Sequence, residues 1–405
     1  MPRRESDLTT RPGRLVQNER LRRDDAADMA AAASSAAELR GARGWGEELE
    51  VGQAFSRLGH RGTWSARHVP PARLFPLRRL GDPLAEAAHR ARRARRGPEG
   101  AGCPGAPGPG GEDALGELRA AERAGCPAAA RLLREARQVP AWLDPAKVRA
   151  GQRFFMRHLH QGLSILGHVS LVGGFSAPWI TPVLRATGYL TGHPRYVVRR
   201  LLETVSMVVS CMEDDAALEV GGRGWEACLR VRLLHAAVRA RLLEMDAWAA
   251  GPDEWGHPIN QEDMVVTLLS FSYNVVYGFQ QAGNPVDAEE AEAYIHAWRY
   301  IGFLLGVAEE HNPCTSLAQS KATLESCALH LIPPDPPKYS VDLAHHVLKV
   351  RTCGRAERGR GLTNKPKVVR QHLGPGLRVP QRAGAPPPGP GDGGRPGDRA
   401  PGPPY

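Results

Sequence analysis

The sequence lacks the cysteine patterns that commonly hold metals or attach haem covalently. Its seven cysteines are scattered over 405 residues, and no two of them form a CxxC or CxxCH motif. This excludes zinc ribbons and c-type haem attachment. An odd number of unclustered cysteines also suits a reducing compartment better than a disulfide scaffold. The first 25 residues contain no apolar core of a secretory signal, so we expect a cytoplasmic protein.

Long apolar runs are scarce as well. The segment from His158 to Leu184 has no Asp, Glu, Lys or Arg over 27 residues, a length sufficient to cross a membrane. It also contains four glycines, two prolines and three histidines, which disfavours a helix that faces lipid. We therefore predict two buried elements broken near Gly173. Membrane association is an alternative and is not predicted.

Glycine and proline divide the chain into three parts. Residues 97–111 hold eleven Gly or Pro in fifteen positions, and Arg, Gly and Pro dominate the chain beyond Gly354. Such stretches do not continue a helix or a strand, and they have little to bury. We predict a low-complexity, largely disordered N-terminal region at 1–111, a helical domain at 112–352 and a disordered C-terminal tail at 353–405.

The net charge of +10 does not reside in the predicted domain. Residues 112–352 contain 23 basic and 27 acidic residues, whereas the flanks contain 30 and 16. Basic runs such as 89–96 can touch RNA or a membrane surface without specificity. No nucleic-acid-binding motif accompanies them. We expect solvated basic arms and no specific nucleic-acid partner.

Apolar residues recur at helical spacing through the central domain, and no period-2 run favours a sheet. This pattern predicts an all-α fold. We expect Pro127 to split the first helical stretch, 114–137, into two helices. Asn260 and Asp263 are spaced as a capping box at the start of another helix. The other predicted helices span 147–169, 195–212, 226–248, 261–281, 288–307 and 316–331.

The helix predicted over 226–248 carries His235 on an apolar face. Arg232 and Arg239 lie one turn to either side of it on the same face. In one reading His235 is an ordinary core histidine bonded to a neighbour, and the arginines pair with carboxylates. In the other, His235 is an axial ligand of haem iron. The arginines then hold propionates or lock adjoining helices.

The preceding helix presents a second candidate face. Arg200 and Thr204 are spaced i, i+4, and Met207 and Cys211 continue the same stripe. A guanidinium and a hydroxyl on such a face can polarise dioxygen at a haem. In the competing reading, Arg200 reaches solvent and Thr204 bonds its own backbone carbonyl.

Together these motifs resemble the latex-clearing-protein (rubber oxygenase) family and its relatives, which include the fungal mycophenolic-acid (MpaB-like) oxygenase. The resemblance rests on Arg200-Leu-Leu-Glu-Thr204 and on Arg230-Val-Arg-Leu-Leu-His235-Ala-Ala-Val-Arg239. Further matches lie at 143–145, at 255–261 with Asp263, and at 297–307. The likeness covers about residues 130–335 of the sequence.

The resemblance implies a globin-like helical core with additional helices that binds haem b non-covalently. It implies that His235 is the proximal iron ligand and that Arg232 and Arg239 support the haem pocket. It places Arg200 and Thr204 on the distal side as catalytic residues. The implied reaction is a dioxygen-dependent oxygenation or cleavage of a double bond in an apolar isoprenoid or lipid-like substrate.

Two departures from the family pattern affect the expected substrate. Rubber oxygenases carry a lysine where this chain has Glu203, and the position of their catalytic acid falls on Leu184. Rubber itself is therefore a poor expectation. An internal lipid or terpenoid fits better.

Other readings remain. A non-catalytic haem protein, such as a gas or redox sensor, would share His235, and a helical interaction module would bind no cofactor. A di-iron oxidase is disfavoured because 112–352 has no paired Glu-x-x-His motif. A cysteine-ligated monooxygenase is disfavoured because neither Cys211 nor Cys228 lies in a glycine-rich loop before a helix. We expect His257 to be a solvated turn residue, and the alternative is a loop histidine near the pocket entrance. We expect Trp298 and Arg299 to pack the core and pair a carboxylate.

Overall fold

The computed structural model describes the chain from residue 49 to residue 356, with gaps. The described residues are 49–96, 114–170, 173–174, 177–187, 190, 194–245, 248, 256–333 and 337–356. The predictions for residues 1–48, for the Gly/Pro-rich stretch 97–111 and for the tail after residue 356 lie outside the described residues.

Apart from one hairpin, the regular secondary structure of the described residues is helical. Strand β1 (Ala54–Arg57) pairs antiparallel with β2 (His60–Thr63), with Phe55 opposite Gly62. The turn between them places Leu58 at φ +49° and Gly59 at φ +83°. Strands of four residues are too short to establish an alternating pattern, which explains why the sequence did not predict them.

The segment around this hairpin was predicted to belong to the disordered N-terminal region, and that prediction is wrong for residues 49–96. The hairpin is followed by α2 (Pro71–Leu74), the 3-10 helix η1 (Phe75–Arg79) and α3 (Pro83–Arg96). Leu74, Leu77 and Ala85 are buried in the main hydrophobic core. The apolar residues are spread over several short elements, so no single stripe is long enough to predict burial.

The remaining helices are α4 (Ala114–Arg123), α5 (Pro127–Arg137), α6 (Pro145–Arg157), α7 (Leu159–Ile165), the π-helix η3 (Leu166–Ser170), α9 (Thr181–Ala186), α10 (Pro194–Met212), α11 (Arg223–Leu243), α14 (Gln261–Phe271), α15 (Tyr273–Gln281), α16 (Ala288–Leu304), the 3-10 helices η4 (Glu309–His311) and η5 (Pro313–Thr315), α17 (Leu317–His330) and α18 (Lys338–Ala356). Pro127 is the first residue of α5, which confirms the predicted split of the first helical stretch.

The uncharged stretch 158–184 does not form one helix. It contains α7, which continues into η3, and α9, and residues 177–180 before α9 are not helical. Within the described residues the stretch is therefore not one helix, but the predicted break near Gly173 falls beside residues outside them. Across the described parts of the chain, none of the helices combines the length and apolar character needed to span a bilayer.

The helix predicted over 261–281 is broken at Ser272 into α14 and α15. Ser272 has φ −99° and ψ −89°, outside the helical region. Its hydroxyl donates to the Leu268 carbonyl at 2.7 Å, a local bond that competes with regular helix geometry. The capping box at the start of α14 is confirmed. Asn260 accepts from the Asp263 amide at 2.9 Å, and Asp263 accepts from the Asn260 amide at 3.3 Å.

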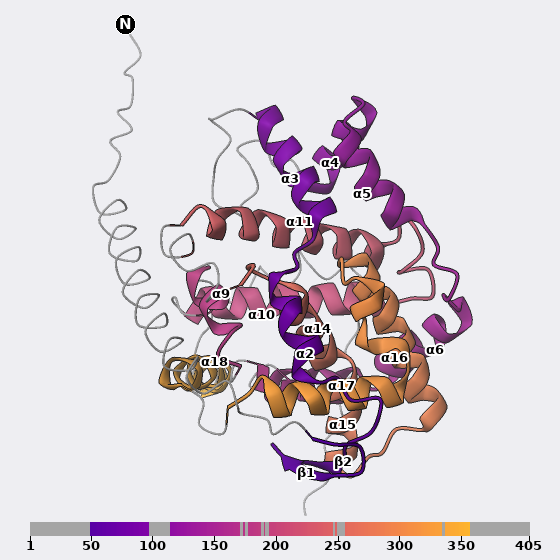
Figure 1. The fold of residues 1–405 in the computed structure, drawn as a ribbon. Helices are drawn as coiled ribbons and strands as arrows, with labels where there is room; N and C mark the ends of the chain where they lie inside the picture. The colour runs from indigo at the N-terminus through magenta and orange to yellow at the C-terminus, as the bar shows by residue number, and fades with distance from the viewer. Residues whose placement is uncertain are drawn as a thin grey trace, which may run out of the picture. The chain divides into compact units, whose positions relative to one another are not determined.

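Helix α11 lies between α10 on one side and α3 and α4 on the other (Figure 1). Close contact between α10 and the start of α11 depends on Gly224, where an added Cβ would lie 2.6 Å from the Cα of Cys211. Helix α6 packs closely along α16, and this contact depends on Gly151. An added Cβ there would lie 2.5 Å from the Ala293 carbonyl oxygen. The contact at Gly224 holds α10 against α11, the two helices that carry the predicted site residues.

Candidate functional site

Helices α10 and α11 bring the two predicted functional faces together. The helices meet at Cys211 and Cys228, whose sulfur atoms are 3.6 Å apart and fully buried. The two helices are consecutive and pack side by side, and from this contact Thr204 lies about two turns back along α10. His235 lies about two turns forward along α11. The two residues are therefore at the same level of the helix pair.

His235 is uncharged and has a free ring nitrogen. Burial, reinforced by the positive charges of Arg239 and Arg200, lowers the pKa of His235 to about 3. Its Nδ1 is buried without a hydrogen-bond partner, and within the described residues neither ring nitrogen is bonded. An ordinary core histidine bonded to a neighbour would have such a partner. The effect of Arg200 also shows that the predicted distal arginine lies within electrostatic range of the ring.

Arg232 pairs with the carboxylates of Asp82 and Glu135. Its Nε and Nη2 donate to Asp82 at 2.6 and 3.1 Å, and its Nη1 lies 2.8 Å from Glu135. Burial alone raises the pKa of Asp82, but the charge and hydrogen bonds of Arg232 lower it overall. Arg232 therefore locks α11 to the start of α3 and to α5.

Arg239 keeps one donor unused. Its side chain is 1% exposed, and its Nε and Nη2 both donate to the Ile259 carbonyl, at 3.0 and 2.8 Å. Its Nη1 is buried without a hydrogen-bond partner. Glu86 lies 3.8 Å from the Arg239 Nε, too far for a hydrogen bond. Arg239 thus carries a buried positive charge with a donor available for an anionic group.

Arg200 and Thr204 make local interactions in α10. The Thr204 hydroxyl donates to the Arg200 carbonyl at 3.1 Å, as the competing reading of Thr204 proposed. Arg200 lies 3.5 Å from Glu203 and its side chain is 31% exposed. Because a hydroxyl oxygen can accept while its proton is donated, Thr204 retains an acceptor.

Several residues at the edge of this site were not predicted to act there. Asp82 and Glu86 come from the segment assigned to the N-terminal region, and Gln261 comes from the first turn of α14. The Gln261 amide donates to the carbonyls of Gly81 at 3.1 Å and Gly306 at 2.9 Å. The motif at 255–261 was the only sequence signal that Gln261 belongs to the site. Its spacing from residue 81 gave no sign that the two lie in contact.

His257 is not the solvated turn residue that was predicted. Its Nε2 lies 2.9 Å from Glu86 Oε1, and its side chain is 21% exposed. Burial alone raises the pKa of Glu86, but its bond to His257 is the largest of the effects that lower that pKa overall. His257 therefore ties the loop before α14 to α3.

The predicted structural roles of Trp298 and Arg299 are confirmed. Trp298 is 2% exposed and belongs to the main core. The guanidinium of Arg299 lies 4.0 Å from the ring centre of Trp142, and its Nε donates to Glu309 at 3.0 Å. The motif at 297–307 therefore builds the core beside the site.

A family model described as "ER-bound oxygenase mpaB/B'/Rubber oxygenase, catalytic domain" matches residues 156–387, more than half of the sequence. The chain belongs to this family. The matched range includes α10 and α11 with Arg200, Thr204 and His235. The resemblance predicted from the motifs of these two helices is therefore confirmed.

Two members of the mpaB/rubber oxygenase family are similar to this chain. Rubber oxygenase from Streptomyces sp. (strain K30) is 30% identical over 201 residues, which cover 49% of this chain and 48% of that protein. The chain thus spans about half the length of that relative. The structure of latex clearing protein LCP in the closed state has a TM-score of 0.50 and 22% identity, covering 68% of this chain and 70% of LCP. This likeness confirms the predicted all-α fold.

Proposed function

We propose that this chain is a haem-b-dependent oxygenase that uses dioxygen to oxygenate or cleave an apolar isoprenoid or lipid-like substrate. Membership of an oxygenase family supports the reaction class. The observation that carries the proposal is the uncharged imidazole of His235, whose Nδ1 is buried without a partner and which lies within range of the charges of Arg239 and Arg200. We assign His235 as the axial ligand of the haem iron.

The chemistry of His235 fits such a ligand. A buried polar atom without a hydrogen bond destabilises a protein by about 1–3 kcal/mol. Coordination uses the lone pair of an unprotonated ring nitrogen, and the low pKa of His235 keeps the ring unprotonated at physiological pH. Iron binding would therefore use the imidazole of His235, which has an unpartnered nitrogen that destabilises the protein when no haem is bound.

The arginines around His235 have different roles in the proposed haem site. Arg239, with its free Nη1, suits an anionic propionate of the porphyrin. Arg232 holds α11 in place through Asp82 and Glu135, so it orients His235 without facing the cofactor. On the other side, Arg200 supplies a positive charge and Thr204 a hydroxyl. When bound, the haem would supply the iron that activates dioxygen.

The proposed substrate is small and apolar. No acidic residue occurs between 158 and 184, so the segment before α10 presents no carboxylate to a substrate. A hydrocarbon with one reactive double bond needs few hydrogen-bonding groups in its binding site. It therefore fits the apolar character of this region. We propose an isoprenoid or another lipid-like molecule as the substrate.

The test is the haem content of His235→Ala. We expect the wild-type protein to take up hemin and show Soret absorbance, and we expect the variant to lose most of it. His345→Ala, at an exposed histidine of α18, is the matched control and should keep full occupancy. Full haem occupancy in His235→Ala, or a folded wild-type protein that binds no hemin, would reject the assignment.

A haem protein without oxygenase activity is the second candidate. Arg200 pairs with Glu203, and Thr204 donates to its own backbone, so both distal groups already have protein partners. This arrangement is the observation that supports a gas or redox sensor as the alternative to an enzyme. Oxygen consumption with a prenylated substrate separates the two candidates, because a sensor binds haem without turning the substrate over.

A further inference from the structure

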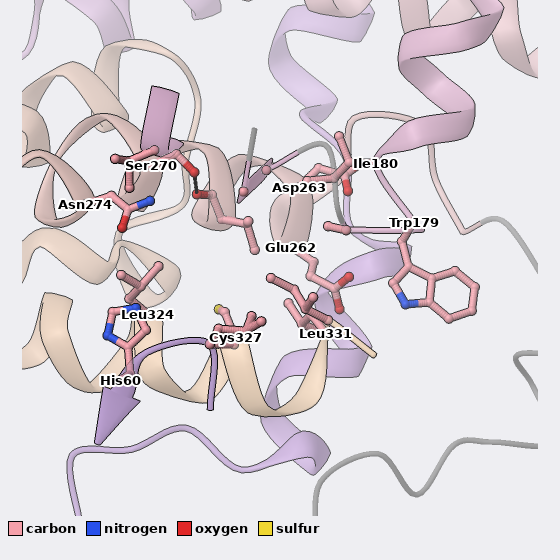
Figure 2. A pocket seen from close by; sticks show the side chains of 18 of the residues that line it. His60, Trp179, Ile180, Glu262, Asp263, Ser270, Asn274, Leu324, Cys327 and Leu331 are labelled. Atoms are coloured by element: carbon pink, nitrogen blue, oxygen red, sulfur yellow. Dashed lines mark hydrogen bonds between the residues drawn. The ribbon is translucent and has the colours of Figure 1, made fainter. Parts of the chain in front are cut away.

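A separate cavity of about 160 Å³ lies between the β1–β2 turn and helices α14, α15 and α17 (Figure 2). Most of its wall is apolar, with Val266, Leu324 and Leu331 among the lining residues. Leu58, at the hairpin turn, also lines it and is 55% exposed, so this residue contacts both the cavity and solvent. None of the five residues predicted for the haem site lines this cavity.

One side chain in this wall has an unused polar atom. Glu262 is 2% exposed, and its Oε1 accepts a hydrogen bond from Arg78 Nη1 at 3.2 Å. Its Oε2 is buried without a partner. Arg78 in turn lies 4.1 Å from the ring centre of Trp179, which also lines the cavity. The carboxyl group is thus held in place with one free oxygen, and Figure 2 shows it among the lining side chains.

The carboxyl of Glu262 carries a proton at neutral pH. Burial raises the pKa of Glu262 to about 8, with Arg78 from η1 opposing the rise and Asp263 adding to it. The other titratable groups of the wall are Cys327 from α17, His60 from β2 and Tyr277 from α15. Since Oε1 accepts from Arg78, the proton resides on Oε2. The protonated form of Glu262 therefore has an O–H donor without an acceptor at the cavity wall.

The size of the cavity limits its occupant. A cavity of roughly 150 Å³ in another protein holds benzene, whereas pockets for drug-sized ligands measure roughly 300–1,000 Å³. A volume of about 160 Å³ therefore takes a group of about six heavy atoms, or the end of a longer molecule.

We propose that this cavity binds the carbonyl-bearing end of a small, neutral apolar molecule, with Glu262 donating a hydrogen bond to the carbonyl oxygen. Asn274 supplies a second polar group to the wall, and its amide makes no hydrogen bond within the described residues. Burial raises the pKa of Asp263, which lines the cavity, to about 6, and the positive charge of Arg239 opposes this rise, so the cavity adjoins the proposed haem pocket. The inference goes beyond the proposed function and requires no haem.

The test compares a ketone with a matched hydrocarbon on the full-length protein. Equilibrium dialysis of 4-methylpentan-2-one and 2-methylpentane measures both affinities at pH 6.5 and pH 9.5. We expect the ketone to bind about tenfold more tightly than the hydrocarbon at pH 6.5. At pH 9.5 Glu262 has lost its proton, so the affinity for the ketone should fall by about tenfold or more. The hydrocarbon should show no such fall.

Two substitutions assign the effect to this site. In Glu262→Gln the amide oxygen still accepts from Arg78 and the NH2 donates into the cavity, so ketone binding should persist and lose its pH dependence. Ala328→Leu adds a branched apolar side chain that fills part of the cavity, so it should abolish binding of both probes. Ala318→Leu, at an exposed position of the same helix, is the control.

Three results would overturn the inference. They are equal affinity for the two probes at pH 6.5, a pH dependence that survives in Glu262→Gln, and a ketone that does not bind the wild-type protein. The pH profile of the wild-type protein is decisive even if a variant fails to fold. Ketone binding should also survive in His235→Ala, so failure of the haem proposal and failure of this one are distinguishable.

Discussion

Arg232 donates two hydrogen bonds, of 2.6 and 3.1 Å, to the carboxylate of Asp82, 150 residues earlier in the chain. Both side chains are at most 4% exposed. The bidentate pair joins the start of α3 to the helix that carries His235. An ion pair in such an environment stabilises the fold only while both partners are present, because either charge alone is buried without compensation.

Asp82→Ala should strongly destabilise the protein. The substitution leaves the guanidinium of Arg232 buried with only Glu135 to balance it. We expect the free energy of unfolding to fall by about 3 kcal/mol, at the lower end for a broken buried pair because Glu135 remains. Urea denaturation followed by circular dichroism measures the change.

The exposed pair of Arg153 and Asp215 is the control for Asp82→Ala. Their side chains are 59% and 55% exposed and 3.1 Å apart. Solvent-exposed pairs contribute about 0–1 kcal/mol, so Asp215→Ala should change little. Equal effects of the two substitutions would show that the Asp82 pair does not stabilise the fold as argued.

Gly306→Ala should also destabilise the protein, through crowding at the same pair. Gly306 has φ +88°, and an added Cβ would lie 2.3 Å from Asp82 Oδ2 and 2.7 Å from Arg232 Nε. Gly221 has φ +87° but no atom within 4 Å of an added Cβ, so Gly221→Ala tests the backbone strain alone. We expect a loss of about 1 kcal/mol for Gly221→Ala and at least about 2 kcal/mol for Gly306→Ala. Thermal unfolding compares the two, and similar losses would count against the crowding argument.

Features encoded within one helix could be predicted from the sequence. The position of His235 between two arginines, the break before Pro127 and the Asn260–Asp263 capping box all depend on neighbours within a few residues. Each follows from helical spacing or from local backbone hydrogen bonding. The structure confirms the capping box and the helix break.

Partners that lie far apart in the chain could not be predicted. Asp82 and Glu86 lie in an Ala- and Arg-rich segment, where single carboxylates look like ordinary solvated charges. Nothing in their spacing points to Arg232 or to His257, and only the packing of α3 on α11 brings them together. The break at Ser272 was missed for a related reason, since a serine inside an apolar helix is compatible with either a continued or an interrupted helix.

His330→Leu should make the protein more resistant to acid. His330 is 5% exposed, and both of its ring nitrogens are buried without partners. Burial, with a smaller effect from His68, lowers its pKa from 6.5 to about 4. Because the folded pKa is below the unfolded one, the unfolded state binds more protons between these two values. Stability is therefore lost as the pH falls through this window.

The leucine variant removes this titration. Relative to the wild-type protein, its free energy of unfolding should rise as the pH is lowered from 6.5 to 5, by up to roughly 2 kcal/mol. Urea unfolding at both pH values measures the difference. His345→Leu, at an exposed position of α18, should show no comparable dependence on pH. A pH-independent offset in His330→Leu would mean that His330 is not the titrating group.

Arg200→Ala should separate binding from catalysis if the proposed oxygenase function is right. His235 remains in place, so haem content should be unchanged, whereas oxygen consumption should fall by about a hundredfold because a preorganised cation is lost beside dioxygen. Arg199→Ala removes a neighbouring arginine that also pairs with Glu203 but is 70% exposed, and it should keep the wild-type rate. Thr204→Ala should slow turnover as well, and Thr204→Ser should restore it by returning the hydroxyl. Loss of haem from Arg200→Ala would make Arg200 a haem-binding residue, and equal rates in the two arginine variants would place it outside the reaction.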